Sequence, residues 1–269
     1  MRSSGARNVA RSAENSGAFR FLARGGFAVN GVMHILIGVI AIRIATGTGG
    51  GSADQSGAFA QLAAAPGGVF LLWIVVVGMF ALGLWYVLEG LLTRGPKPNR
   101  AWLHKLTSIA KGVVYLVLGY TAFTFANGGS TSSAGTSQSF SAKVLAAPGG
   151  VFVVALVGLI VFAVGGYFVV KGSRRKFLLD LRLPSGRGGR AITFLGATGY
   201  VAKGLALGIV GVLFVDGALT HKASDTRGLD GALRALTALP YGGFILVVVG
   251  LGVIAYGLYC FVRSARSTI

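Results

Sequence analysis

The fold is decided by residues 66–92, whose sequence is PGGVFLLWIVVVGMFALGLWYVLEGLL. This stretch holds a single charged residue, Glu89, near its end. Because a bilayer core is crossed by about 20 predominantly apolar residues in helical form, we expect a membrane-spanning helix here. The opening proline marks its start, since proline at the first helical position lacks only a donor that has no partner within the helix.

Six stretches satisfy the same criterion, and the composition of the whole chain agrees with them. They are 26–45, 67–92, 108–127, 149–171, 196–215 and 241–262. Only 12% of the 269 residues are charged and 54% are hydrophobic, whereas a soluble domain carries about 25% charged residues. This composition excludes an ordinary soluble domain and an intrinsically disordered chain. The single cysteine, Cys260, excludes an intrachain disulfide.

Basic residues are distributed unequally between the two sides of the predicted membrane domain. Of the 25 lysines and arginines, 18 fall in the N-terminal tail, the second and fourth connections and the C-terminus, and four on the opposite side. The 18 are Arg2, Arg7, Arg11, Arg20, Arg24, Arg94, Lys97, Arg100, Lys105, Lys171, Arg174, Arg175, Lys176, Arg182, Arg187, Arg190, Arg263 and Arg266. Because basic loops stay in the cytoplasm, we expect both termini there. The net charge of +18 therefore reflects topology, and we expect no nucleic-acid partner.

Three proline–glycine turns begin the even-numbered spans, at Pro66, Pro148 and Pro240. The residue 17 positions after each proline is a glycine, and each odd-numbered span contains an Asn-Gly or Lys-Gly pair followed seven residues later by another glycine. These glycines are Gly83, Gly165 and Gly257, then Gly31, Gly112 and Gly204, then Gly38, Gly119 and Gly211. Small residues let helices approach one another in lipid. We therefore expect an all-α membrane protein with six transmembrane helices, arranged as three tandem helical hairpins with pseudo-threefold symmetry about the membrane normal.

The repeats divide the chain into six segments. The segments are a basic tail, 1–22, hairpin repeats at 23–94, 104–175 and 196–269 (the last with a short C-terminal tail), and basic linkers at 95–103 and 176–195. The tail and the second linker interleave basic residues with apolar ones such as Phe177 and Leu181. We expect both segments to lie against the anionic lipids of the inner leaflet.

The connections inside the first and third hairpins share a second motif. Ser56-Gly57-Ala58-Phe59 corresponds to Asp230-Gly231-Ala232-Leu233, and each is followed by a leucine three residues later. Ser and Asp are preferred residues at helix N-caps. We therefore expect a short amphipathic helix in each connection, capped by Ser56 or Asp230, whereas the second repeat shows no clear cap.

These features together resemble a bacterial membrane family known as domain of unknown function 1206. The resemblance rests on the Lys/Asn-Gly-x6-Gly first helix, the Gly-Ala-(Phe/Leu)-x-x-Leu connection and the Pro-x-Gly start of the second helix, all in tandem. It covers about residues 20–266, and the second repeat departs from it in a Gly/Ser/Thr-rich connection, 128–139. The resemblance implies three tandem hairpins and a location in the bacterial plasma membrane, but no activity.

Polar residues within spans are candidate functional groups, because they are costly to place in lipid. The candidate intramembrane cluster comprises Asn30, His34, Glu89, Lys111 and Lys203. Asn30 and His34 share a helix face. Glu89 lies at a depth similar to that of the lysines, so we expect it to be ionised and paired with Lys111 or Lys203. The alternative is that each lysine extends to the headgroups of the inner leaflet.

No motif for catalysis or for cofactor binding occurs in the sequence. It lacks a nucleophile elbow, a Walker loop, HExxH and CxxC. His34, His104 and His221 fall at three different depths, so they do not converge as metal ligands would. We expect no enzyme activity, no cofactor and no metal.

Three hypotheses for function remain. The first is a non-enzymatic scaffold that binds lipid, a protein partner (including a second copy of the chain) or a small ligand. The alternative is a channel or transporter-like conduit for an ion or small solute along the pseudo-threefold axis. A membrane-embedded enzyme using His34 and Glu89 has the least support. A hydrated ring of Asn30, Lys111 and Lys203 would favour the conduit, and a dry glycine-packed axis would favour the scaffold.

Overall fold

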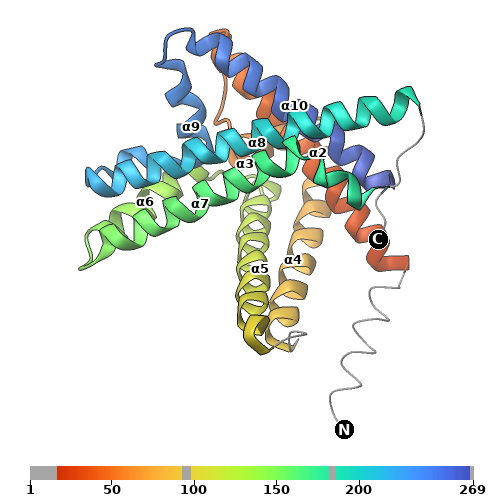
Figure 1. Ribbon diagram of the computed structural model, residues 1–269, viewed down its shortest axis with the longest axis horizontal. Coiled ribbons are helices and arrows are strands. Elements are labelled where there is room, and N and C mark those ends of the chain that lie inside the picture. Colours follow the sequence, from red (N-terminus) through yellow and green to blue (C-terminus); the bar gives the residue numbers. More distant parts are fainter. Residues whose placement is uncertain (1–16, 93–97, 182–185, 267–269) are drawn as a thin grey trace. The chain divides into compact units, whose positions relative to one another are not determined.

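The computed structural model describes residues 17–92, 98–181 and 186–266, and most of these residues are helical. The long helices are α2 (Gly17–Ala45), α4 (Gly68–Leu92), α5 (Pro98–Ala126), α7 (Gly150–Ser173), α8 (Arg187–Leu219) and α10 (Gly242–Arg266) (Figure 1). Each of these six helices is long and apolar enough to cross a membrane. The six predicted spans and the all-α fold class are therefore confirmed.

The long helices extend into segments predicted as tail and linkers. α2 begins at Gly17, inside the predicted tail 1–22, and α5 begins at Pro98, inside the linker 95–103. The linker 176–195 contains the short 3-10 helix η1 (Lys176–Asp180) and the start of α8. A membrane helix can continue past the hydrocarbon core, since its backbone hydrogen bonds are made within the helix wherever it lies. The basic residues predicted at 1–16, 93–97 and 182–185 lie outside the described residues.

Short helices occupy the connections inside the first and third repeats, as predicted, and a third one occupies the connection inside the second repeat. These connecting helices are α3 (Gln55–Ala64), α6 (Ser133–Leu145) and α9 (Gly228–Thr237), and a 3-10 turn, η2 (Ala223–Asp225), precedes α9. The apolar side of each motif is buried: Phe59 is 1% exposed and Leu233 is fully buried. The helices α3 and α9 therefore pack onto the protein by the apolar face of their motif, whereas Phe140 of α6 is 63% exposed.

The caps of the connecting helices differ from the prediction. Asp54 caps α3, because its Oδ1 accepts a hydrogen bond from the backbone N–H of Gly57 at 3.1 Å, whereas Ser56 is the second residue of the helix. Asp230 is the third residue of α9 and cannot be its N-cap. The second repeat does have a cap: Ser132, which accepts from the third residue of α6 at 3.0 Å. Several polar residues precede each helix, so composition alone did not determine which one caps it.

The described helices fall into two compact units. One contains α4 and α5 with the first part of α2 and the end of α3; the other contains the rest of α2 and α3 together with α6 to α10. Within the first unit α4 packs along α5, and within the second α7 packs along α8, which also contacts α10 (Figure 1). Threefold symmetry about the membrane normal stays a prediction.

Glycines set the closest helix contacts in both units. A Cβ atom added to Gly165 of α7 would lie 2.7 Å from the carbonyl oxygen of Gly204 in α8, and one on Gly204 would lie 2.6 Å from the carbonyl oxygen of Gly165. Gly31 of α2 and Gly257 of α10 are related in the same way, at 2.8 and 2.6 Å. Only the absence of a side chain allows backbones to come this close.

The same contact occurs between α4 and α5. Gly83 and Gly112 face one another, and a Cβ on either would lie 3.1 or 2.9 Å from the other's carbonyl oxygen. The prediction that Gly83, Gly165 and Gly257 occupy equivalent helix contacts is confirmed. In each case the second helix of one repeat packs on the first helix of the next repeat, and the last repeat packs on the first. The two helices that pack most closely therefore belong to different hairpins.

Candidate functional site

The second unit brings polar side chains from three spans together. We call this group the aromatic–polar cluster and define it as Asn30 and His34 of α2, Lys203 of α8, and Tyr256 and Cys260 of α10. Their positions follow from the glycine contacts described above. Asn30 precedes Gly31 and Lys203 precedes Gly204, so each polar residue lies beside a point of close helix approach.

Hydrogen bonds tie the two polar residues of α2 to one another and to α10. The Asn30 side-chain amide donates to Sγ of Cys260 at 3.3 Å. Nδ1 of His34 donates to the backbone carbonyl oxygen of Asn30 at 2.8 Å. The His34 ring lies 4.7 Å from the Tyr256 ring, centre to centre. Asn30 and His34 thus form contacts across a helix interface, as polar residues in membrane helices commonly do.

The ammonium group of Lys203 lies over aromatic rings. Its Nζ is 4.3 Å from the centre of the Tyr256 ring and 5.3 Å from that of Phe168, which belongs to α7. A cation is attracted to the face of an aromatic ring, by about 2 kcal/mol or more where water is excluded. Three helices, α7, α8 and α10, therefore hold this lysine.

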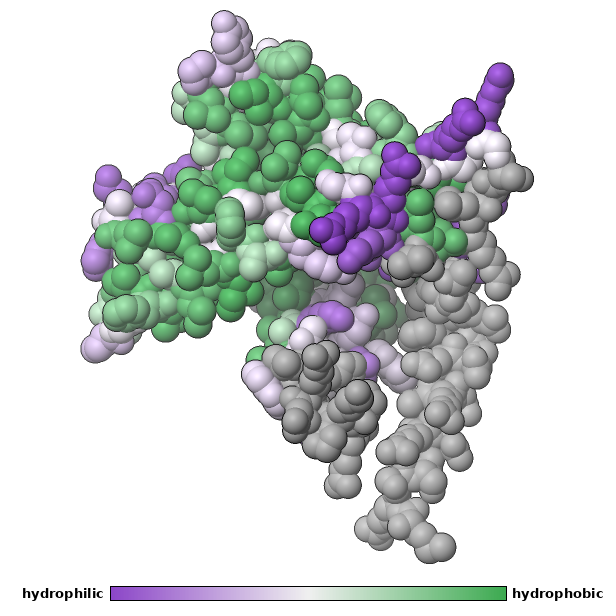
Figure 2. Space-filling model, in the orientation of Figure 1, coloured by the Kyte–Doolittle hydropathy of each residue, from purple (hydrophilic) through white to green (hydrophobic). Residues whose placement is uncertain are grey.

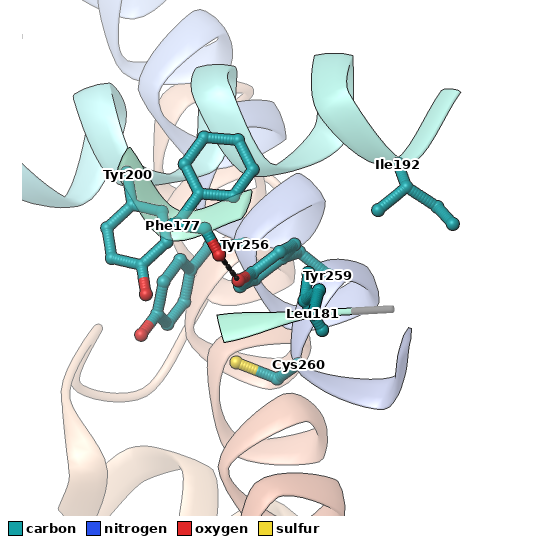
Figure 3. Packing of buried hydrophobic residues seen from close by; sticks show 7 residues of the cluster. All are labelled: Phe177, Leu181, Ile192, Tyr200, Tyr256, Tyr259 and Cys260. Atoms are coloured by element: carbon teal, nitrogen blue, oxygen red, sulfur yellow. Dashed lines mark hydrogen bonds between the residues drawn. The ribbon is translucent and has the colours of Figure 1, made fainter. Parts of the chain in front are cut away.

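An aromatic layer covers the cluster, and it includes a residue of the loop between α7 and α8. Figure 3 shows Phe177 of η1 packed against Tyr200 and Tyr259, whose ring centres are 5.4 and 5.2 Å away. The hydroxyl of Tyr259 donates to the backbone carbonyl oxygen of Phe177 at 3.5 Å. Gly196 makes room for the ring, because a Cβ there would lie 2.3 Å from it.

The prediction that this loop presents its apolar residues to the lipid is wrong for two of them. Phe177 is fully buried and Leu181 is 8% exposed, both inside the protein core. Tyr259 of α10, which packs on Phe177, is also fully buried. The sequence could not distinguish these destinations, because an apolar residue beside basic ones suits either a lipid interface or a protein core.

Glu89 and Lys111, the remaining predicted site residues, belong to the first unit. Nζ of Lys111 lies 5.6 Å from the centre of the Tyr86 ring, which stacks on Tyr115 with centres 5.6 Å apart. Glu89 lies in the last turn of α4 and is half-buried. The structure therefore brings Asn30, His34 and Lys203 together in one unit, and the pairing of Glu89 stays a prediction.

One position that sequence reasoning missed completes the pattern. The residue 20 positions after each repeat's proline is Tyr86, Phe168 or Cys260. Each contacts the residue before the glycine of the next repeat's first helix: Lys111 lies over Tyr86, Lys203 over Phe168, and Asn30 donates to Cys260. A lysine thus faces a ring, and an amide faces a sulfur. The signal was present in the repeat alignment, because the preceding position, 19 residues after the proline, is aromatic in all three repeats: Trp85, Tyr167 and Tyr259.

A second polar group connects the three connecting helices. Asp230 of α9 accepts hydrogen bonds from the backbone N–H of Ala53 at 2.8 Å and from Nε of Arg234 at 3.0 Å. Oγ of Ser56, in α3, accepts from the backbone N–H of Ser133, in α6, at 3.1 Å. These hydrogen bonds join the connections of the three repeats to one another within the second unit.

Asp54 is a buried carboxylate within this group. It is 1% exposed, and its Oδ1 accepts from Oγ of Ser56 at 2.6 Å. Its Oδ2 is buried without a hydrogen-bond partner among the described residues. A buried carboxylate oxygen without a partner costs free energy of folding.

The described residues contain no group of three or more His, Cys, Asp or Glu side chains placed to hold a metal ion. His34 contacts Asn30 and Tyr256, as described above. His221 lies in the turn after α8, whereas η1 precedes the other end of that helix. The side chain of His104 lies outside the described residues.

Comparison with known proteins places the chain in a family. The family model described as Domain of Unknown Function (DUF1206) matches residues 25–93, 106–175 and 198–267. The chain belongs to the DUF1206 family. Its three matches coincide with the three repeats, so each DUF1206 unit is one first helix, one connecting helix and one second helix.

This DUF1206 chain is similar to a bacterial protein. Uncharacterized protein YxxB of Bacillus subtilis (strain 168) is 34% identical over 253 residues, which cover 91% of this chain and 90% of YxxB. No solved structure matches the chain. The protein is therefore a multi-pass membrane-type DUF1206 protein with a bacterial homologue.

Proposed function

We propose that this protein is a non-enzymatic membrane scaffold that binds anionic lipids at its basic end. The observation that carries the proposal is the glycine contact found in all three close helix pairs, where backbone lies against backbone. Such contacts leave no water-filled passage between the paired helices and resist relative sliding. A fixed framework of this kind suits binding more than transport.

The candidate polar residues support the same reading. Lys203 lies over Tyr256 and Phe168, and Asn30 donates to Cys260. A conduit needs ionisable groups that face a hydrated pore and exchange partners during passage. Within the second unit these groups are instead engaged by the protein's own side chains.

The basic residues supply the lipid-binding surface. Figure 2 shows hydrophilic atoms, in purple, gathered where α8 begins and α10 ends, beside apolar helix surfaces in green. The exposed basic residues at this end of the second unit are Arg174 and Arg175 after α7, Lys176 of η1, Arg187 and Arg190 of α8, and Arg266 of α10. Each Lys or Arg near an anionic membrane surface contributes about 1 kcal/mol of attraction. We propose that this end faces the cytoplasm of a bacterial cell and that the plasma membrane is the location.

The lipid proposal is tested by native mass spectrometry of the full chain in detergent, with phosphatidylglycerol or phosphatidylcholine added. We expect more bound phosphatidylglycerol, and a loss of that preference in the triple variant Arg174→Ala, Arg175→Ala, Lys176→Ala. The matched control removes three positive charges from the connecting-helix side: Lys143→Ala, Lys222→Ala, Arg227→Ala. Equal binding of the two lipids by the unmodified protein would overturn the proposal.

Flux through proteoliposomes decides between the scaffold and the conduit. Vesicles containing the protein and dyes for H⁺, K⁺ or Cl⁻ should show the same leak as protein-free vesicles. A flux that the unmodified protein supports and that Lys203→Met abolishes would establish the conduit instead.

A further inference from the structure

A groove runs along the surface between α7 and α8. Its volume is about 350 Å³, and it is lined by Leu159, Phe162, Gly211, Val212, Val215, Asp216 and Leu219. The apolar lining is exposed: Leu159 by 56%, Phe162 by 52% and Val212 by 54%. Both helices are long and apolar enough to span the membrane. The groove therefore opens toward the hydrocarbon of the bilayer.

The groove exists because a glycine lies at its base. A Cβ on Gly211 would lie 2.6 Å from the backbone nitrogen of Phe162, so α7 and α8 touch here by their backbones. Phe162 and Val212 line the groove on either side of Gly211, which has no side chain to fill it. A flexible hydrocarbon chain suits this shape, since apolar pockets of about 300 Å³ or more commonly hold small ligands.

A single carboxylate lies at one end of the groove. Asp216 is exposed, in the last turn of α8, and within the described part of the chain its carboxylate makes no hydrogen bond or ion pair. A negative charge is unfavourable at a helix C-terminus. The equivalent residues, 12 positions after the first-helix glycine, are Arg43 and Thr124. The repeat framework thus does not require an acid here, and the third repeat alone has one.

We propose that this groove binds one phospholipid whose headgroup carries a primary amine, that is, a phosphatidylethanolamine. One acyl chain lies between Phe162 and Val212, and the ammonium group donates to the Asp216 carboxylate. The interaction complements a charge that the described protein leaves without a counter-ion. A primary ammonium has three N–H donors, whereas the quaternary ammonium of phosphatidylcholine has none. The site is distinct from the basic end and does not depend on the scaffold proposal.

Native mass spectrometry of the full chain tests this site, with phosphatidylethanolamine and phosphatidylcholine of identical acyl chains added in separate titrations. We expect the amine lipid to bind about tenfold more tightly, since it alone can donate a charge-assisted hydrogen bond to the Asp216 carboxylate. Asp216→Asn should reduce the affinity for phosphatidylethanolamine to that for phosphatidylcholine. Val212→Phe, which fills the groove, should weaken the binding of both lipids.

Two control variants separate the site from general effects. Asp225→Asn removes one negative charge from η2, and Val248→Phe enlarges an exposed residue of α10, which does not line the groove. Neither should change the lipid preference, and all four variants should keep the thermal stability of the parent, since the altered side chains are exposed or in loops. Equal affinity for the two lipids in the unmodified protein, or a preference that survives Asp216→Asn, would overturn the proposal. Unchanged binding in Val212→Phe would also overturn it.

Discussion

Replacing Gly165 by alanine tests whether backbone contact holds α7 and α8 together. The added Cβ would lie 2.7 Å from the carbonyl oxygen of Gly204, 2.7 Å from the nitrogen of Gly208 and 3.1 Å from its Cα. All three atoms belong to the backbone of α8, so no side chain can rotate away. Relief requires that the two helices separate, which is the situation in which overpacking costs about 1–3 kcal/mol.

The neighbouring glycine provides the control. Gly166 lies in the same helix, and a Cβ there would meet nothing within 4 Å. Alanine is favoured over glycine in a helix by about 1 kcal/mol, and this gain is common to both substitutions. The difference in unfolding free energy between Gly165→Ala and Gly166→Ala therefore isolates the contact, and we expect it to be about 1–3 kcal/mol.

Thermal unfolding in detergent, followed by near-ultraviolet circular dichroism, measures this difference. Gly166→Ala should unfold at or above the temperature of the parent, and Gly165→Ala should unfold below both. Gly165→Leu should unfold at a lower temperature still, because the larger side chain displaces α8 further. Equal unfolding temperatures for the two alanine variants would refute the assignment of the α7–α8 contact.

Three further predictions concern charge and topology. Asp54→Asn should raise the unfolding temperature, because Oδ1 and its hydrogen bonds are kept while a buried carboxylate with an unpartnered oxygen is removed. Asp54→Ala should instead lower the stability by about 0.5–2 kcal/mol, because the cap of α3 is lost. A lowered unfolding temperature for Asp54→Asn would contradict this prediction. Glu89→Gln should destabilise the protein, and adding Lys111→Met should recover much of the loss, because a lysine left without its partner is costly in a membrane span; no recovery would exclude Lys111 as the partner. Reporter fusions after residues 55, 135 and 225 should be external and those after 98, 183 and 269 internal, and one reversed fusion would disprove the orientation.

Much of the fold was predictable because the repeats carry the same glycines at the same spacings. Gly83, Gly165 and Gly257 indicate where a helix must be approached closely, whatever approaches it. The pattern does not predict which helix packs there, since a glycine allows close approach by any helix with a small residue at the matching position. The pairing of Gly257 with Gly31 therefore came only from the structure.

The candidate site was predictable only in part, for a related reason. Membrane depth placed Asn30, His34 and Lys203 on the list, because any polar residue there is costly. Their partners, Cys260, Tyr256 and Phe168, are apolar or weakly polar, and aromatic residues in particular occur throughout the spans. Nothing local distinguishes a tyrosine that faces a lysine from one that faces lipid, so these partners required the packing of α7, α8 and α10.

The contact between α2 and α10 has a consequence for how the chain is made. Asn30 and Cys260, which meet across it, are separated by 230 residues. At a synthesis rate of about 5–20 residues per second, roughly 10–50 s pass between the emergence of the first helix and that of its closest partner. Throughout this interval the glycine face of the first helix is in the membrane with no matching helix to cover it. The glycine face of α2 is therefore covered only when α10 has been made. In a nascent chain interrupted before α10, this face of the first helix stays exposed to lipid.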